Sequence, residues 1–147
     1  MKKLIRLVSF VLVFSFAIVL PVHAETVVEP RGSKFFAAHD TFLYKTGATE
    51  FQVWFDVTAN AAIMEQLGVS CIDVDVSADG VNWTVAKTYT MQEYYSQMIC
   101  ENTVSHTGYV TYTDAIPGYY YRAYITFYAK NSYGIGELFR YAPAIQM

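Results

Sequence analysis

The sequence predicts an all-β domain, an antiparallel sandwich of about seven strands with one short helical insertion. Several segments alternate apolar and polar residues with a period of two, which is the pattern of a strand with one buried face. Turn-forming residues separate these segments at short, regular intervals. No strand pattern alternates with a long helical pattern, so a parallel α/β sheet is not expected.

The segment 117–136 gives the clearest strand prediction. It opens with the Pro117-Gly118 turn and closes with a second run of turn residues over 131–136. The residues between are rich in Tyr, Ile, Phe and Thr, which suit a pleated, half-buried surface. We expect a long central strand here, followed by a short partner strand over 137–141. The predicted core face of the central strand carries Tyr121, Ala123, Ile125, Phe127 and Ala129.

Other strands follow from the same alternation. Segment 69–77 alternates, and the Asp79-Gly80 turn leads into a return strand that ends near Thr90. A further strand is expected over 107–113, and one or two edge strands over 33–45. Segment 50–59 alternates over its whole length, and its predicted core face carries Phe51, Val53, Phe55, Val57 and Ala59.

Two segments depart from the strand pattern. Segment 60–67 is predicted to form one or two helical turns, with Asn60 as the N-cap and Gly68 as the stop. Segment 91–105 has no clear period and is predicted to be the longest irregular stretch.

The first 24 residues have the features of a secretory signal peptide. Lys2, Lys3 and Arg6 precede an apolar run, and Val22-His23-Ala24 forms a cleavage site. An uncleaved membrane anchor is the alternative, but the apolar run is shorter than the roughly 20 residues that a span needs. We expect cleavage after Ala24, a flexible leader over 25–32, one domain over 33–147, and a secreted, extracellular product.

The charge balance of the expected mature chain is acidic. The full chain has 10 Lys and Arg against 13 Asp and Glu, and the predicted signal peptide contains three of the cations and no acid. A mature net charge near −6 argues against nucleic acid or a membrane surface as a partner.

Cys71 and Cys100 are the only cysteines. An even count in an exported chain favours a disulfide between them. The alternative is a free thiol at Cys71, which alternates with Asp73 and Asp75 rather than with the apolar residues. Neither His39 nor His106 has zinc-ligand spacing to a cysteine, so no metal site is expected.

Two segments resemble parts of fibronectin type III domains. The run 129–134, Ala-Lys-Asn-Ser-Tyr-Gly, together with the preceding Pro117-Gly118, is similar to the sixth strand and following turn of that family. The run 77–83 resembles a hairpin common in such domains. Trp54 departs from the pattern, because it lies on the opposite face from the family's core tryptophan. The resemblance implies an immunoglobulin-like sandwich, and the chain as a whole resembles small secreted proteins of Gram-positive bacteria.

Candidate binding residues are aromatic. The polar face of the central strand carries three tyrosines and two cations, and a row of such rings suits stacking on sugars or anchoring a protein partner. The alternative is ordinary cross-strand pairing on the wet side of a sheet. Two tyrosines in segment 91–105 and a tryptophan on the polar face of segment 50–59 are further candidates. The candidate set is Tyr120, Arg122, Tyr124, Tyr128, Tyr94, Tyr95 and Trp54.

No catalytic or cofactor-binding motif is present in the sequence, so no enzymatic activity and no cofactor are expected. Cys100 and His106 are expected to be structural. Asp73, Asp75 and Asp79 could suggest a calcium site, but the hairpin is too short for the usual twelve-residue loop, so these carboxylates are expected to face Arg or Lys on a neighbouring strand. The sequence therefore predicts a secreted, non-enzymatic module that binds a polysaccharide or a protein at or outside the cell surface. A structural subunit of a surface assembly is the first alternative, and a small hydrolase is the second.

Overall fold

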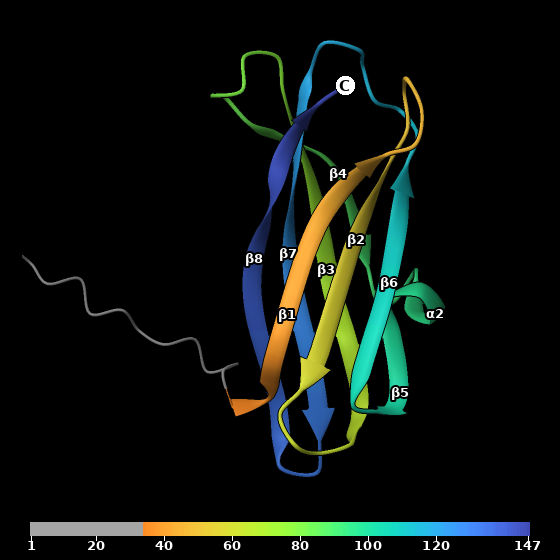
Figure 1. The fold of residues 1–147 in the computed structure, drawn as a ribbon, viewed down its shortest axis with the longest axis vertical. Coiled ribbons are helices and arrows are strands. Elements are labelled where there is room, and N and C mark those ends of the chain that lie inside the picture. Colours follow the sequence, from red (N-terminus) through yellow and green to blue (C-terminus); the bar gives the residue numbers. More distant parts are fainter. Residues whose placement is uncertain (1–33) are drawn as a thin grey trace, which may run out of the picture.

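The computed structural model describes residues 34–147 as two antiparallel sheets stacked in two layers (Figure 1). The predicted signal peptide and leader lie outside the described residues. No helix within 34–147 has the length and hydropathy needed to cross a bilayer. The described elements are β1 (Phe36–Lys45), β2 (Phe51–Ala59), β3 (Met64–Ser77), β4 (Thr84–Thr90), α2 (Tyr95–Met98), β5 (Ile99–Thr103), β6 (Ser105–Tyr112), β7 (Tyr120–Asn131) and β8 (Gly134–Gln146).

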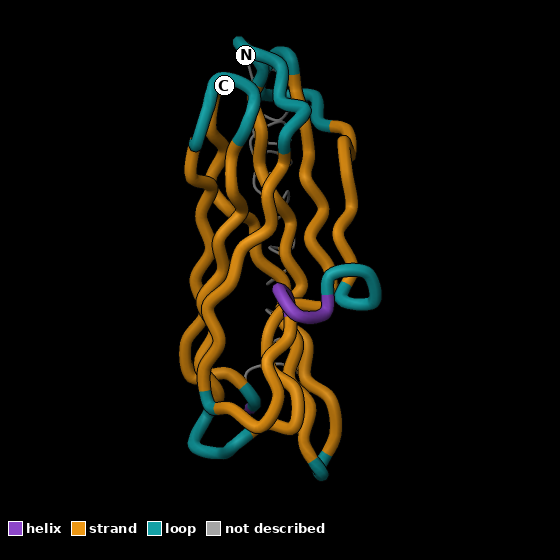
Figure 2. Tube along the Cα trace, turned by 90° about the vertical axis from the view of Figure 1, so that its right-hand side faces the viewer, coloured by secondary structure: helices purple, strands orange, loops and turns teal. Residues whose placement is uncertain are grey.

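The strand order divides the chain between the two layers. One sheet has the order β1-β2-β6, and the other has the order β4-β3-β7-β8 with β5 also paired to β3. Because β7 covers one edge of β3, both β4 and β5 lie on the other edge. β4 pairs with Cys71–Val76 and β5 with Met64–Gly68. The helix α2, drawn in purple in Figure 2, lies where the chain passes from β4 to β5, and it contacts β6.

The core lies between the two sheets and is built from the predicted faces. The five residues on the predicted core face of β2 and the five on that of β7 are all buried, which confirms both predicted core faces. Phe51 of β2 and Tyr121 of β7 meet across the layers with ring centroids 5.2 Å apart. Large aromatic pairs such as this one fill the wide space between two sheets.

The predicted helix over 60–67 is wrong. Residues 60–62 form a bend, in which Ala61 has a φ of 61°, and Met64 begins β3. Met64 and Leu67 are buried, and the strand pairs with β5 on one edge and with β7 on the other. Two ladders of hydrogen bonds and a buried face outweigh the local capping signal, because one or two isolated helical turns have little stability of their own.

The predicted irregular stretch is also wrong in part. Segment 91–105 contains α2, β5 and the first residue of β6. α2 has only four residues and β5 only five, so neither is long enough to show a period in the sequence. The partner strand of β7 is longer than predicted, since β8 covers 13 residues. The structure therefore has eight strands within 34–147, against about seven expected.

Candidate functional site

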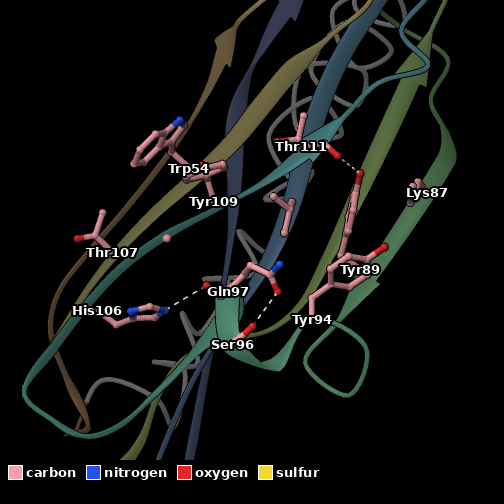
Figure 3. Close-up of a pocket in the computed structure, with 12 residues that line it drawn as sticks. Trp54, Lys87, Tyr89, Tyr94, Ser96, Gln97, His106, Thr107, Tyr109 and Thr111 are labelled. Carbon is pink, nitrogen blue, oxygen red and sulfur yellow. Dashed lines mark hydrogen bonds between the residues drawn. The ribbon is translucent and has the colours of Figure 1, made fainter.

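A groove of about 520 Å³ runs along the edge strand β6 (Figure 3). β6 pairs with β2 on one side only, and the groove separates its other side from β4. α2 supplies Ser96 and Gln97, and β2 supplies Trp54. The groove therefore lies at the open side of the sandwich, where both sheets end. It is lined by Trp54, Lys87, Tyr89, Tyr94, Ser96, Gln97 and the β6 residues His106, Thr107, Gly108, Tyr109, Val110 and Thr111.

The rings of Trp54 and Tyr109 form the wall on the side of β2 and β6. Phe42, Trp54 and Tyr109 are direct partners across β1, β2 and β6, and we call them the aromatic ladder. The ring centroids of Phe42 and Trp54 lie 6.2 Å apart with planes 3° apart, and those of Trp54 and Tyr109 lie 4.7 Å apart. Phe42 is 48% exposed and Tyr109 is 43% exposed, so the ladder offers ring faces to solvent beside the groove.

Two tyrosines form the opposite wall. Tyr89 and Tyr94 meet edge to face with centroids 5.1 Å apart, and the Lys87 ammonium lies 4.8 Å from the centre of the Tyr89 ring. The Tyr89 hydroxyl donates a hydrogen bond of 2.8 Å to the carbonyl of Thr111. Burial, with a smaller contribution from Tyr94, raises the pKa of Tyr89 far above its usual range, so the hydroxyl remains a donor. This bond joins β4 to β6 across the open side.

Glycines allow α2 to approach the strands at the base of the groove. A Cβ on Gly108 would lie 2.5 Å from the Gln97 carbonyl oxygen and from the Phe55 ring. The Nε2 of His106 lies 3.2 Å from that same carbonyl. Burial lowers the pKa of His106, although the Gln97 carbonyl and Asp56 oppose the shift. The base of the groove is therefore fixed by close backbone contact and presents a neutral imidazole.

A second polar surface lies on the outer face of the five-stranded sheet. The Arg122 guanidinium lies 4.4 Å from the centre of the Trp83 ring and 4.6 Å from that of Tyr141. Its Nε is 3.0 Å from Asp75 Oδ2, which confirms that this carboxylate faces an arginine on a neighbouring strand. Tyr124 packs on Tyr141 and stacks on Phe139 with planes 6° apart. The side chains of Arg122 and Tyr124 therefore already have partners within this surface.

Five of the seven predicted candidate residues lie in the groove or on the outer face of the five-stranded sheet. Tyr120, Arg122 and Tyr124 are half-buried on the outer face of the five-stranded sheet. Trp54 and Tyr94, which the sequence placed far apart, line the same groove.

The expectation of a solvent-facing Tyr128 is wrong. Tyr128 is 6% exposed, because β7 is buried on both faces over residues 125–129, and its hydroxyl lies 3.4 Å from Gln66 Oε1. Tyr95 lies outside the groove and donates a hydrogen bond of 2.7 Å to Glu101, while Gln66 donates one to its hydroxyl. Neither tyrosine therefore contributes to the groove.

Several groove residues were missed from the sequence. Tyr109 alternates with buried residues of β6, so the period of two in 107–113 was a signal for an outward-facing ring. Tyr89 is the one buried residue of β4 and also its only aromatic residue, so its ring was the available signal. Gln97 reaches the groove through its backbone carbonyl, which side-chain patterns do not report.

The predicted disulfide is wrong, since Cys71 and Cys100 are both free. Cys100 pairs with Leu67 across β3 and β5, and Cys71 lies four residues further along β3. That offset corresponds to about 13 Å along a strand, whereas a disulfide needs Cα atoms within about 7 Å. Burial, together with the negative charge of Asp73, raises the pKa of the Cys71 thiol.

Of the three aspartates expected to face Arg or Lys, Asp75 does so, whereas Asp73 and Asp79 have other partners. Asp73 accepts a hydrogen bond from Thr88, and Asp79 accepts backbone bonds of 2.8 Å from Val81 and Asn82 in the β3–β4 turn. These bonds lower the pKa of Asp79. No group of three or more His, Cys, Asp or Glu in the described part of the chain is placed to hold a metal ion.

The chain matches no protein-family model, no curated protein and no solved structure. Its function is therefore argued from the groove and from the sheets that form it.

Proposed function

We propose that this protein is a secreted, non-enzymatic binding module with an immunoglobulin-like or fibronectin type III-like sandwich fold. Its ligand is a polysaccharide or a protein segment at or outside the cell surface, and it binds in the groove along β6. The observation that carries this proposal is a groove of about 520 Å³ that aromatic rings line on two sides. Ligand sites of this kind typically have volumes between about 300 and 1,000 Å³ and contain few, well-placed polar groups.

The distribution of strands supports the fold assignment. In immunoglobulin-like domains the first, second and fifth strands share one sheet, and the third, sixth and seventh share the other. Here β1, β2 and β6 form one sheet, and β3, β7 and β8 lie in the other with β4 paired to β3. The arrangement agrees with that topology when β4 is taken as the strand that follows the third, and β5 as an addition to the same edge.

The residues of the groove support binding rather than catalysis. No carboxylate and no thiol lines it among the residues described. The hydroxyl of Tyr89 is bonded to Thr111, and His106 faces a backbone carbonyl. A nucleophile and a base within hydrogen-bond reach of each other, which covalent hydrolysis needs, are not found there.

Binding by purified protein would test the proposal. The chain without its predicted signal peptide is incubated with insoluble polysaccharides, with isolated cell walls and with immobilised linear peptides. We expect saturable binding to one class of matrix, and we expect Trp54→Ala and Tyr94→Ala to weaken it because each removes a ring from one wall of the groove. Tyr133→Ala is the matched control, since Tyr133 is 94% exposed in the β7–β8 turn.

The outer face of the five-stranded sheet gives the second arm of the test. A Tyr120→Ala/Tyr124→Ala variant should bind as the wild type does if the groove is the site. Loss of binding in that variant alone would move the site to the outer face. Absence of binding to every matrix would favour the alternative role as a structural subunit.

A further inference from the structure

The free side of β6 presents backbone groups to the groove. Ala59 donates a backbone hydrogen bond of 2.8 Å to Val104 at the start of the β2–β6 ladder. Bonded and non-bonded pairs alternate along an antiparallel ladder. With the register Phe55↔Gly108 and Trp54↔Tyr109, Gly108 is bonded to β2 and Tyr109 is not. The N–H and C=O of Thr107 and Tyr109 therefore point away from β2.

The backbone groups on the free side of β6 have hydrogen-bond partners at Ser105 and Thr111, near the two ends of the strand, but within the described part of the chain not between them. The Thr103 hydroxyl donates to the Ser105 carbonyl at 2.7 Å and accepts from the Ser105 N–H. The Thr111 carbonyl accepts the bond from Tyr89. Among residues 34–147, no donor or acceptor reaches the backbone of Thr107 or of Tyr109 on this side. Two consecutive outward-facing residues of β6 are thus available for pairing.

β6 also differs from the other edge strands in composition. Natural edge strands are commonly protected against further pairing by charged residues or proline. β8 carries Arg140 and Pro143, β1 carries Lys45, and β4 carries Lys87. The sequence of β6, Ser-His-Thr-Gly-Tyr-Val-Thr-Tyr, contains no Asp, Glu, Lys, Arg or Pro. β6 is therefore the edge strand whose composition leaves pairing open.

We propose that the groove binds an extended polypeptide segment, which adds to β6 as a new strand and pairs with the backbone of Thr107 and Tyr109. This inference rests on the proposed binding function and selects the protein ligand over the polysaccharide. The outward donors and acceptors of a strand repeat every second residue, about 6.8 Å apart, which is the spacing that another strand presents. Strand addition of this kind draws its affinity from the main chain and its specificity from pockets for alternate side chains.

The walls of the groove indicate which side chains the segment carries. Alternate residues of an added strand point to opposite faces of the sheet. One set would lie beside the aromatic ladder at Trp54 and Tyr109, which suits apolar or aromatic side chains. The cation in the groove is Lys87, and no carboxylate lines it among the described residues. We therefore expect neutral or acidic segments to be preferred over basic ones.

Proline at Thr107 separates main-chain pairing from other modes of binding. Thr107→Pro removes an N–H that faces the groove and leaves the bonds between β2 and β6 in place, and proline is tolerated at such edge positions. Thr107→Ala is the matched control, because it removes the hydroxyl that bonds to Asp56 but keeps the N–H. Linear peptides are selected on the wild-type protein from a displayed random library, and their affinities are measured for all three proteins.

We expect Thr107→Pro to bind roughly tenfold more weakly than Thr107→Ala, because both lack the hydroxyl and only the proline lacks the N–H. Amide hydrogen exchange of the wild-type complex gives a second readout that needs no variant. Bound peptide should slow exchange at Thr107 and Tyr109 and leave Gly108 and Val110, which are already bonded to β2, nearly unchanged.

Each outcome either supports or overturns strand addition. Selected peptides that bind without slowing exchange at Thr107 and Tyr109 would overturn it, and so would a selection that yields no peptide. Polysaccharide binding that Trp54→Ala abolishes and Thr107→Pro does not affect would overturn it while leaving the proposed binding function intact. Absence of binding to both polysaccharide and peptide would overturn both proposals.

Discussion

Arg122 Nε lies 3.0 Å from Asp75 Oδ2, and the guanidinium is held between the rings of Trp83 and Tyr141. The side chain of Asp75 is only 10% exposed, and Arg122 is its ion-pair partner. A carboxylate that is taken out of water and left unpaired is strongly destabilising. The contact therefore stabilises the five-stranded sheet and gives the arginine a structural role on this face.

Replacement of Arg122 should destabilise the fold. We expect Arg122→Met to lower the free energy of unfolding by about 2 kcal/mol, because it leaves Asp75 without its partner and removes two cation–π contacts. Urea denaturation followed by tryptophan fluorescence would measure the change. Lys130→Met is the matched control on the same strand, since Lys130 takes part in no ion pair among the described residues. Equal stability of the two variants would contradict the structural role of Arg122.

Gly68 should not tolerate a side chain. It has a φ of 155°, and a Cβ at this position would collide with the backbone carbonyl of Met98. We expect Gly68→Ala to cost about 3 kcal/mol or more, because it combines backbone strain with an overlap that forces α2 away from β3. Thermal unfolding would report the loss.

Gly118 provides the comparison for Gly68. It has a φ of 88°, but nothing lies within 4 Å of its ideal Cβ position. Gly118→Ala should therefore cost only about 1–2 kcal/mol, which is the strain alone. A Gly68→Ala variant no less stable than Gly118→Ala would show that α2 does not pack as described.

The cysteines should be free thiols in the folded protein. We expect two reactive thiols per chain after unfolding without a reductant, and the same melting temperature with and without dithiothreitol, because Cys71 and Cys100 are too far apart to pair. Slow alkylation of Cys71 near neutral pH is also expected, since burial raises its pKa and the thiolate is the reactive form. Mass spectrometry of the alkylated protein would check both points. A protein mass lower by two hydrogen atoms, as a disulfide would give, together with no alkylation, would contradict the structure.

Stability should fall as the solution becomes acidic. Burial lowers the pKa of His39, as does the nearby charge of Arg140, while Asp40 opposes them. Burial also lowers the pKa of His106. The histidines of the unfolded chain therefore bind protons first as the pH falls through about 6.5. The free energy of unfolding decreases from that pH downward, until the histidines of the folded protein are protonated as well.

Melting temperatures between about pH 8 and pH 5 would measure this dependence on the histidines. We expect the melting temperature of the wild type to decrease over this range. A His39→Gln/His106→Gln variant should lose most of the decrease, because neither replacement titrates. An equal decrease in both proteins would assign the pH dependence to other groups. His39 is the more informative single position, since its Nδ1 is buried without a hydrogen-bond partner.

Alternation in the sequence was sufficient to predict the core faces of β2 and β7. Each of these strands lies inside a sheet, so its core face is buried along its whole length. The alternation is uninterrupted in β2, whereas in β7 Thr126 and Tyr128 are buried as well. β3 was predicted only from Val69 onward because a bulge near Ser70 shifts its register on β7, and the buried face changes parity there. Its first residues were then read as a helix.

The groove was predictable only in its separate parts. Trp54 was recognised as an outward ring and Tyr94 as a candidate in an irregular stretch. The sequence could not show that both lie at the same open side, because this depends on α2 packing against β6 through Gly108. The stripe on β7 was predicted as a continuous solvent-facing surface, but residues 125–129 are buried on both faces of the strand, Tyr128 among them.

The pairing of β3 with β7 has a consequence for how quickly the chain folds. It joins Gln66 to Lys130 at one end and Ser77 to Tyr120 at the other, so the central ladder of the larger sheet links segments remote in sequence. The loop between these segments must close, at a cost in chain entropy, before their contacts stabilise the fold. Domains dominated by such pairings fold in milliseconds to seconds rather than microseconds. Until β3 and β7 meet, the strands of both sheets expose apolar faces, and refolding at high protein concentration should therefore compete with aggregation.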